Sequence, residues 1–181
     1  LHPIPLWFLN YISRYSEDQK KTRRELVKLI EKIRCGRTGT LQHFPKNLTP
    51  SLALLVGAHV ADGCISPVPN RSSLQWEISD AYRENLEKIH EIVLSLFKLD
   101  LPVKKFSRAK AWYIKTRKQI IPRFLKEIFD MPVGKKLSIE EPSILKYPEE
   151  DQRLLTKPTK KQKRKLELYF VKGIMMFDGF C

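Results

Sequence analysis

Two Asp-Gly pairs stand at matching places in two similar segments of this 181-residue sequence. Residues 55–63 read LVGAHVADG and residues 171–179 read VKGIMMFDG, and each segment has a Gly six residues before its terminal Gly. Asp62 and Asp178 directly precede the terminal glycines, so the matched positions are offset by 116 residues. A carboxylate at the end of a helix, beside a Gly that turns the chain away, projects towards a substrate, and its oxygens suit hard cations such as Mg²⁺. The alternative is that each Asp only belongs to a turn.

The elements around the first Asp-Gly pair predict an α+β unit with mostly antiparallel strand pairing. A helix capped by Thr49 or Ser51 is expected to run to about Ala61, and the alternation of apolar and polar residues over 73–80 is typical of a half-buried strand. Further strands are expected over 64–69, 103–108 and 111–118, and further helices over 83–98 and from Pro122 onward. The order is therefore α-β-β-α-β-β-α.

The chain divides into three parts by pattern. Residues 1–45 are expected to form a helical N-terminal extension, because an apolar stripe over 16–35 predicts an amphipathic helix. Residues 46–153 hold the α+β unit. Residues 154–181 read as a basic linker followed by the first helix, from near Leu166, of a second and incomplete unit.

These features resemble the LAGLIDADG homing endonuclease family. The resemblance covers residues 46–179 and includes the Pro-Lys and Thr-Pro lead-in to the first segment. The first segment matches the motif at Leu55, Gly57, Ala61, Asp62 and Gly63. The family likeness implies an αββαββα repeat with a four-stranded DNA-binding sheet, and a second repeat that ends after its first helix. In the second segment Phe177 stands at the position of Ala61, and a bulky side chain there works against a tight crossing of the two helices.

The resemblance implies a site-specific endonuclease that depends on Mg²⁺ and cuts both strands of DNA. Asp62 and Asp178 would lie side by side and bind metal, together with the backbone of Ala61 and Phe177. A basic residue just after the third helix would stabilise the transition state electrostatically. Lys135 or Lys136 stands at that place, and the alternative is that both are plain loop lysines.

Small residues in the two motif segments predict a close approach of two helices. Ala53, Gly57 and Ala61 recur every four residues, and Gly173 is the counterpart of Gly57. The alternative is that this strip packs on its own sheet. His59, on the same helix, is interpreted as a packed or capping histidine rather than a metal ligand.

The strands are expected to present the DNA-binding surface. From residue 104 to 118 there are seven basic residues and no acidic one, and a two-stranded ribbon of this kind fits the major groove. The alternative is a solvated basic face, with Trp76 and Trp112 in the core. The expected DNA-binding residues are Gln75, Glu77, Ser79, Lys104, Lys105, Arg108, Tyr113, Lys115 and Arg117.

Composition agrees with a polyanionic partner. The chain has 34 Lys and Arg against 20 Asp and Glu, a net charge of +14, which favours nucleic acid over an anionic membrane. A protein that is merely lysine-rich is the alternative. No apolar run approaches the roughly 20 residues of a spanning helix, so no membrane partner is expected. Cys35, Cys64 and Cys181 form neither a zinc motif nor a disulfide framework, which favours a reducing compartment, cytoplasmic or organellar.

Two other functions remain open on the same scaffold: a catalytically weak DNA-binding regulator and an intron-RNA maturase. The basic run over 157–165 is interpreted as a linker that tracks phosphates, or as a mobile tether. The helix over 166–179 is expected to dock on the helix over 51–62, because Phe170, Ile174 and Phe177 need apolar cover. Either a C-terminal repeat or a second chain is then expected to complete the protein.

Overall fold

The fold is α+β, built on a four-stranded antiparallel sheet. The computed structural model describes residues 4–5, 32–35, 40–135, 140–148, 150, 154 and 157–178. The strands are β1 (Ile4–Pro5), β2 (Lys32–Cys35), β3 (Thr40–His43), β4 (Asn47–Leu48), β5 (Gly63–Pro67), β6 (Leu74–Asp80), β7 (Lys104–Lys105) and β8 (Trp112–Thr116). The helices are α3 (Pro50–Asp62), α4 (Arg83–Phe97), α5 (Ile120–Phe129), α6 (Ser143–Lys146) and α7 (Lys160–Phe177).

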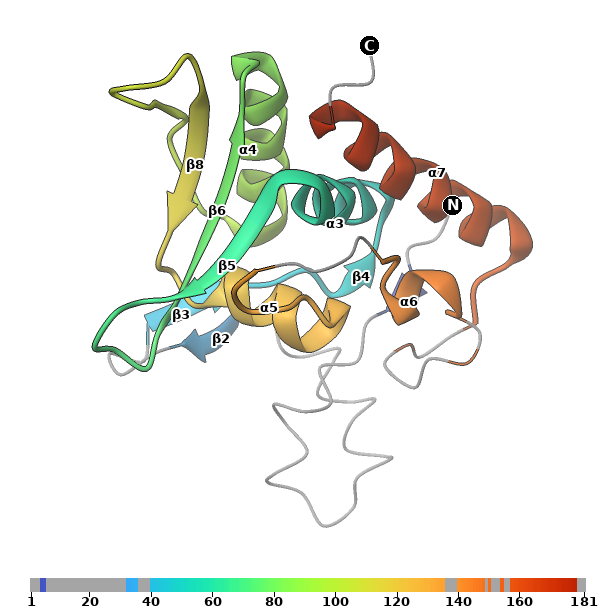
Figure 1. Cartoon of the computed structure of the whole chain (residues 1–181). Coiled ribbons are helices and arrows are strands. Elements are labelled where there is room, and N and C mark those ends of the chain that lie inside the picture. The colour runs from blue at the N-terminus through green and yellow to red at the C-terminus, as the bar shows by residue number, and fades with distance from the viewer. Residues whose placement is uncertain are drawn as a thin grey trace.

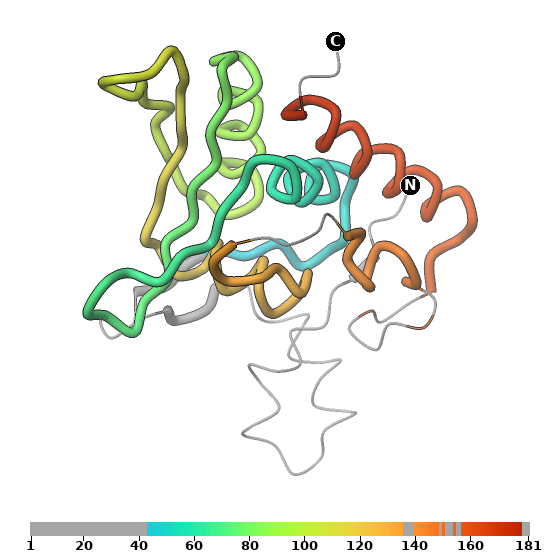
Figure 2. Tube along the Cα trace, viewed as in Figure 1, coloured from blue at the N-terminus to red at the C-terminus, as the bar shows by residue number. Residues whose placement is uncertain are grey.

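The main sheet has the strand order β5-β6-β8-β7, with every pair antiparallel. Helices α3 and α4 lie along one face of this sheet, and α7 lies on the far side of α3 (Figure 1). The chain trace shows the same layers, with α5 below α3 (Figure 2). The element order from α3 to α5 is therefore the predicted α-β-β-α-β-β-α, although β7 is only two residues long.

Helix α3 is the centre of the hydrophobic core. Thr49 caps its first turn by accepting a hydrogen bond from the Leu52 backbone N–H at 3.2 Å, and Pro50 fits there because the first turn needs no N–H donor from it. All residues from Leu52 to Val60 are buried, so α3 has no solvated face of the kind a surface helix keeps. It is covered by the sheet and α4 on one side and by α7 on the other.

Helices α3 and α7 touch backbone to backbone at two glycines. A Cβ added to Gly57 would overlap the Phe170 carbonyl and lie 3.1 Å from the Ile174 nitrogen. A Cβ added to Gly173 would overlap the Leu54 carbonyl and lie 2.8 Å from the Ala58 nitrogen. Phe170 and Ile174 are the counterparts of Leu54 and Ala58 at the offset of 116 residues. The two helices therefore pack reciprocally, as two copies of one motif would.

Helix α7 begins earlier than its apolar pattern predicts. Thr159 and Gln162 form a capping box, and the helix starts at Lys160 rather than near Leu166. Part of the basic run over 157–165 is therefore helix, which corrects its interpretation as a linker or mobile tether. The predicted docking on α3 is confirmed, since Phe170 and Phe177 are buried in the shared core and Ile174 packs against it. The bulk of Phe177 does not prevent the close crossing, which lies one turn earlier at Gly173.

The elements described in the N-terminal segment, residues 1–45, are strands. β2 pairs with β3 and β1 pairs with β4, both antiparallel. The prediction of a helix over 16–35 is wrong at its end, because Lys32–Cys35 forms the strand β2. This strand pairs with β3 instead of forming a last helical turn. Residues 16–31 of that expected helix lie outside the described residues. Among the helices described, none combines the length and apolar character needed to cross a membrane.

The glycine contact makes a prediction about stability. An exposed helical Gly→Ala change usually stabilises a helix by up to about 1 kcal/mol, but Gly173→Ala would force a methyl group into the α3 backbone. We expect a loss of about 1–3 kcal/mol in the free energy of unfolding, measured by urea denaturation. The control is Lys172→Ala on the exposed side of α7, which should change that free energy by no more than about 0.5 kcal/mol. An unchanged midpoint for Gly173→Ala would contradict the close crossing.

Candidate nucleic-acid interface and carboxylate site

Strands β6 and β8 present a polar face on the side of the sheet away from α3 and α4. The register sets Glu77 opposite Lys115 and Ser79 opposite Tyr113. The Lys115 ammonium forms an ion pair with the Glu77 carboxylate at 2.7 Å. The Arg117 guanidinium donates to Gln75 Oε1 at 3.4 Å. These predicted residues therefore do share one face, whereas Trp76, Ile78 and Ile114 point the other way and are fully buried.

The outer strands extend this face, which we call the outer sheet face. Lys104 pairs with Tyr113 in the register, and the Tyr113 ring packs on Phe106 with centroids 4.5 Å apart. On the other edge, Cys64 pairs with Glu77 and Ser66 pairs with Gln75. Cys64 is an exposed free thiol. Cys64 and Ser66 are not among the residues predicted from the sequence for this face. Their alternation with the apolar Ile65, which is buried, is the pattern that indicates their outward orientation.

Two other expected DNA-binding residues lie elsewhere. Lys105 pairs with Trp112 in the register, and its ammonium lies 5.6 Å from the centre of the Trp112 ring. Arg83 of α4 lies over the same ring at 5.1 Å, so Lys105 belongs to the helix side of the sheet. Lys105 therefore faces away from Lys104, because successive residues of a strand point to opposite sides of the sheet, and its expected contact with DNA stays a prediction. Arg108 is exposed in the loop that joins β7 to β8.

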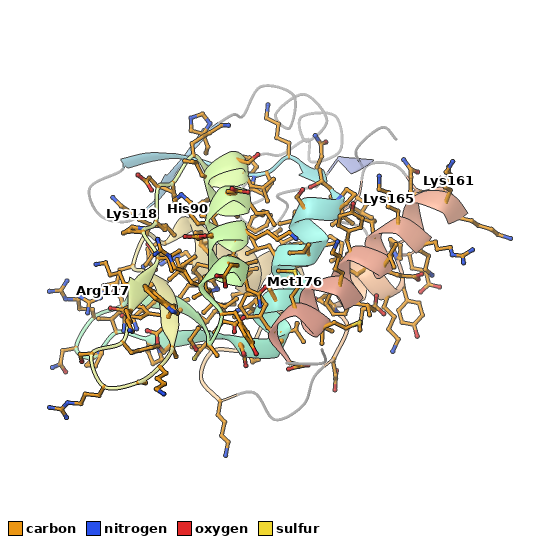
Figure 3. The ribbon with its side chains drawn as sticks, turned by 90° about the horizontal axis from the view of Figure 1, so that it is seen from above. His90, Arg117, Lys118, Lys161, Lys165 and Met176 are labelled. Carbon is orange, nitrogen blue, oxygen red and sulfur yellow. The ribbon has the colours of Figure 1, made fainter. Side chains whose placement is uncertain are left out.

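The two motif carboxylates stand at the C-terminal ends of the paired helices. Asp62 is the last residue of α3, and Asp178 is the C-terminal cap of α7; both are exposed. Both helices run in the same general direction, so these ends lie on the same side of the molecule (Figures 1 and 3). A helix C-terminus carries partial negative charge and favours a cation. Within the described part of the chain, no three His, Cys, Asp or Glu side chains group closely enough to bind a metal alone.

His59 and Gly63 fit together behind Asp62. The Trp76 indole N–H donates to His59 Nδ1 at 3.2 Å, in the buried layer between α3 and β6. His59 is therefore a packed histidine, as expected. Gly63 has an extended backbone, with φ −80 and ψ 155, so it does not turn the chain through a left-handed conformation. It is small because a Cβ would overlap the His59 ring and lie 2.6 Å from the His59 Cα.

Lys135 is held close to the strand that follows Asp62. The Gly134 N–H donates to the Ile65 carbonyl at 2.7 Å, and the φ of 97 at Gly134 is readily adopted only by glycine. Lys135 then lines a cavity of about 510 Å³ together with Val60, from the last turns of α3. Lys136 lies outside the described residues.

Acidic side chains also line this cavity: Asp130, Glu140 and Glu141. Burial raises the pKa of the Glu141 carboxyl, and the neighbouring Glu167 carboxylate of α7 raises it further. Asp130, also in the lining, accepts a hydrogen bond from the Ser143 hydroxyl at 3.0 Å. The Ser143–Asp130 bond therefore links the start of α6 to the end of α5 in the wall of the cavity.

No protein-family model matches the sequence, and no curated protein matches it.

The contact behind Asp62 makes a second prediction about stability. Gly63→Ala would drive a methyl group into His59 and displace it from the Trp76 indole. We expect the free energy of unfolding to fall by about 1–3 kcal/mol, with a changed near-ultraviolet circular dichroism spectrum because Trp76 moves. Ser66→Ala, on the outer sheet face of the same strand, serves as the matched control. Wild-type stability and spectrum for Gly63→Ala would refute the steric role given to Gly63.

Proposed function

We propose that the chain is a site-specific, Mg²⁺-dependent endonuclease of the homing type, which cuts both strands of its DNA target. The observation that carries this proposal is the reciprocal packing of α3 and α7. Gly57 contacts Phe170 and Ile174, while Gly173 contacts their counterparts Leu54 and Ala58. This arrangement brings two copies of the motif together, so that each contributes one exposed carboxylate at the same side of the protein.

The residues at this side fit a hard divalent cation. Mg²⁺ typically takes one or two carboxylates and completes its shell with water and substrate phosphate oxygens, so a pair of Asp side chains is enough. Asp62 and Asp178 would bind the metal, assisted by the backbone of Ala61 and Phe177. When bound, the metal supplies an activated water and offsets charge on the leaving oxygen. Lys135 would bring a positive charge to the same phosphate.

The outer sheet face would bind the DNA. Lys104, Lys115 and Arg117 supply positive charge there, and Gln75 and Ser79 supply donors and acceptors for base edges in the major groove. Because Glu77 and Gln75 already hold Lys115 and Arg117, the basic side chains are ordered before DNA arrives. Ser66 and Cys64 extend the same surface to the β5 edge.

The outward face of α7 supports a second repeat. Leu168, Val171 and Met175 are exposed, at 63%, 47% and 51%. Their counterparts in α3, at the offset of 116 residues, are Leu52, Leu55 and His59, all buried beneath the first sheet. A second four-stranded sheet, from a C-terminal repeat or a second chain, would cover this face in the same way.

The maturase alternative has one observation in its favour. The first turns of α7 expose Lys160, Lys161 and Arg164, and Lys161 lies at the opposite end of the molecule from Arg117 (Figure 3). A basic surface remote from the outer sheet face suits an RNA bound in addition to DNA. The regulator alternative is disfavoured because both carboxylates are retained.

The proposal is tested with a plasmid library of intron-insertion junctions, incubated with the protein with and without Mg²⁺. Linearised plasmid that appears only with Mg²⁺, cut at one sequence, is the expected result. Tight binding to one junction without cleavage under any divalent metal would favour the regulator instead. The selected junction then serves as the target in the following measurements.

Loss of the first carboxylate should separate cleavage from binding. Asp62→Asn is expected to abolish cleavage, because it removes a metal ligand, and to leave target affinity within a few-fold, because Asp62 makes little direct DNA contact. Cleavage is measured by single-turnover assay and affinity by fluorescence titration. Asp100→Asn, another exposed Asp, is the control and should cut normally. An intact cleavage rate in Asp62→Asn would remove Asp62 from the catalytic site.

The register supplies a matched pair of variants for DNA binding. Arg117→Ala should weaken specific binding by about 1–3 kcal/mol if Arg117 reads a base edge. If it contacts only phosphate, it should weaken all sequences alike and lower the salt slope by about 1. Lys105→Ala removes the same charge from the helix side of the sheet and should have the smaller effect. Equal losses for the two variants would show that the outer sheet face is not the binding surface.

A further inference from the structure

One side-chain network joins the end of β6, the start of α4 and the last turn of α7. The Asn85 side-chain amide donates to Asp80 Oδ2 at 2.8 Å and to the Met176 carbonyl at 2.8 Å. Asp80 Oδ1 accepts from the Tyr82 backbone N–H at 2.9 Å. Both Asn85 partners are acceptors, so the orientation of its amide is set, and both of its N–H groups are used.

The Met176 carbonyl is a group that needs such a donor. The last four carbonyls of a helix have no partner within the helix. At the end of α7 the Asp178 N–H bonds to the Ile174 carbonyl at 2.9 Å, and Asn85 provides the donor for the carbonyl of Met176, two residues further on. Figure 3 places Met176 at the C-terminal part of α7, towards α3. The bonded carbonyl is only two residues from Asp178.

The other end of the network is a rigid anchor. Asp80 is 8% exposed, and a buried carboxylate is costly unless donors satisfy it. Two donors do so here, and the backbone of Asp80 pairs with Trp112 inside the sheet. The orientation of Asn85 is therefore set by the same sheet that carries the outer sheet face.

We infer that Asn85 is a positioning residue for the Asp178 carboxylate, acting through the Met176 carbonyl. Its bonds to Asp80 and to the Met176 carbonyl fix the position and orientation of the last turn of α7 relative to the sheet. A metal-binding pair must be held to within about 0.5 Å to be productive, and Asp178 stands on a helix that is far from the sheet in sequence. This inference rests on the proposed metal site, because it concerns one of its two carboxylates.

A purely structural role for Asn85 makes a different prediction. If Asn85 only helped α7 to dock on α3, any other substitution that weakens this docking equally would weaken metal binding at Asp178 by the same factor. Leu166 is buried at 3% in the N-terminal half of α7, away from Asp178. Leu166→Ala loosens the docking without touching the last turn, so it is the matched control for Asn85→Leu, which keeps the side-chain size and removes the donor.

The experiment measures Mn²⁺ binding to the whole chain by electron paramagnetic resonance, with hydrogen exchange of the amides from residue 175 to 178. Asn85→Leu should raise the Mn²⁺ Kd by about ten-fold and speed that exchange, as removal of an outer-shell partner does at other metal sites. Leu166→Ala should keep the Kd within about two-fold of wild type, because it removes no partner of the metal ligands. Asp178→Asn defines the loss expected when the ligand itself is removed.

The outcomes separate this inference from the proposed function. If Asp178→Asn weakens Mn²⁺ binding but Asn85→Leu does not, the positioning role is wrong and the metal site stands. Equal weakening by Asn85→Leu and Leu166→Ala also overturns positioning, because docking alone explains it. If wild type and Asp178→Asn bind Mn²⁺ alike, the metal site itself fails. Should Asn85→Leu not fold, Asn85→Gln decides: a raised Kd at unchanged stability supports positioning, and a wild-type Kd overturns it.

Discussion

The backbone contact between α3 and α7 at Gly57 and Gly173 is the constraint on which the rest of the structure depends. Because there is no room for a Cβ on either side, each helix packs along the other at the level of main-chain atoms, and dispersion contacts are made over the whole crossing. This contact completes the cover of α3, which is buried from Leu52 to Val60. It also fixes the relative direction of the two helices, so that both motif carboxylates lie on one side of the molecule.

The sheet divides the molecule into an apolar side and a basic side, and the division follows strand alternation. Trp76, Ile78 and Ile114 fill the layer against the helices, so Glu77, Lys115 and Arg117 must face outward. The Glu77–Lys115 ion pair is partly exposed, and pairs of this kind contribute about 0–1 kcal/mol. It can therefore hold Lys115 in place without preventing its transfer to a phosphate or base.

Sequence patterns predict much of this fold because most strands and helices bury one face. Apolar residues then recur about every 2 residues in a strand and about every 3.6 residues in a helix. The strand over 73–80 and the helices over 83–98 and 51–61 follow directly from such patterns. Thr159 and Gln162 carry the pattern of a capping box and so indicate the early start of α7. The basic residues that follow have no apolar stripe, so hydrophobic periodicity places the start later. The sequence did not show that Lys104 and Lys105 face opposite sides of the sheet, because β7 is only two residues long. Asn85 could not be found from the sequence, since its partner Met176 is 91 residues away.

The two carboxylates, equivalent in the motif, are held in different ways. Asp62 is continuous with the sheet, because the next residue, Gly63, pairs with Ile78 at the start of β5, and the His59 ring packs against that same Gly. Asp178 depends on contacts made by α7: the crossing at Gly173, the burial of Phe177 and the bond from Asn85. The position of Asp62 is thus a consequence of local chain geometry. That of Asp178 is a consequence of tertiary packing, so substitutions remote in sequence can displace it while Asp62 stays in place.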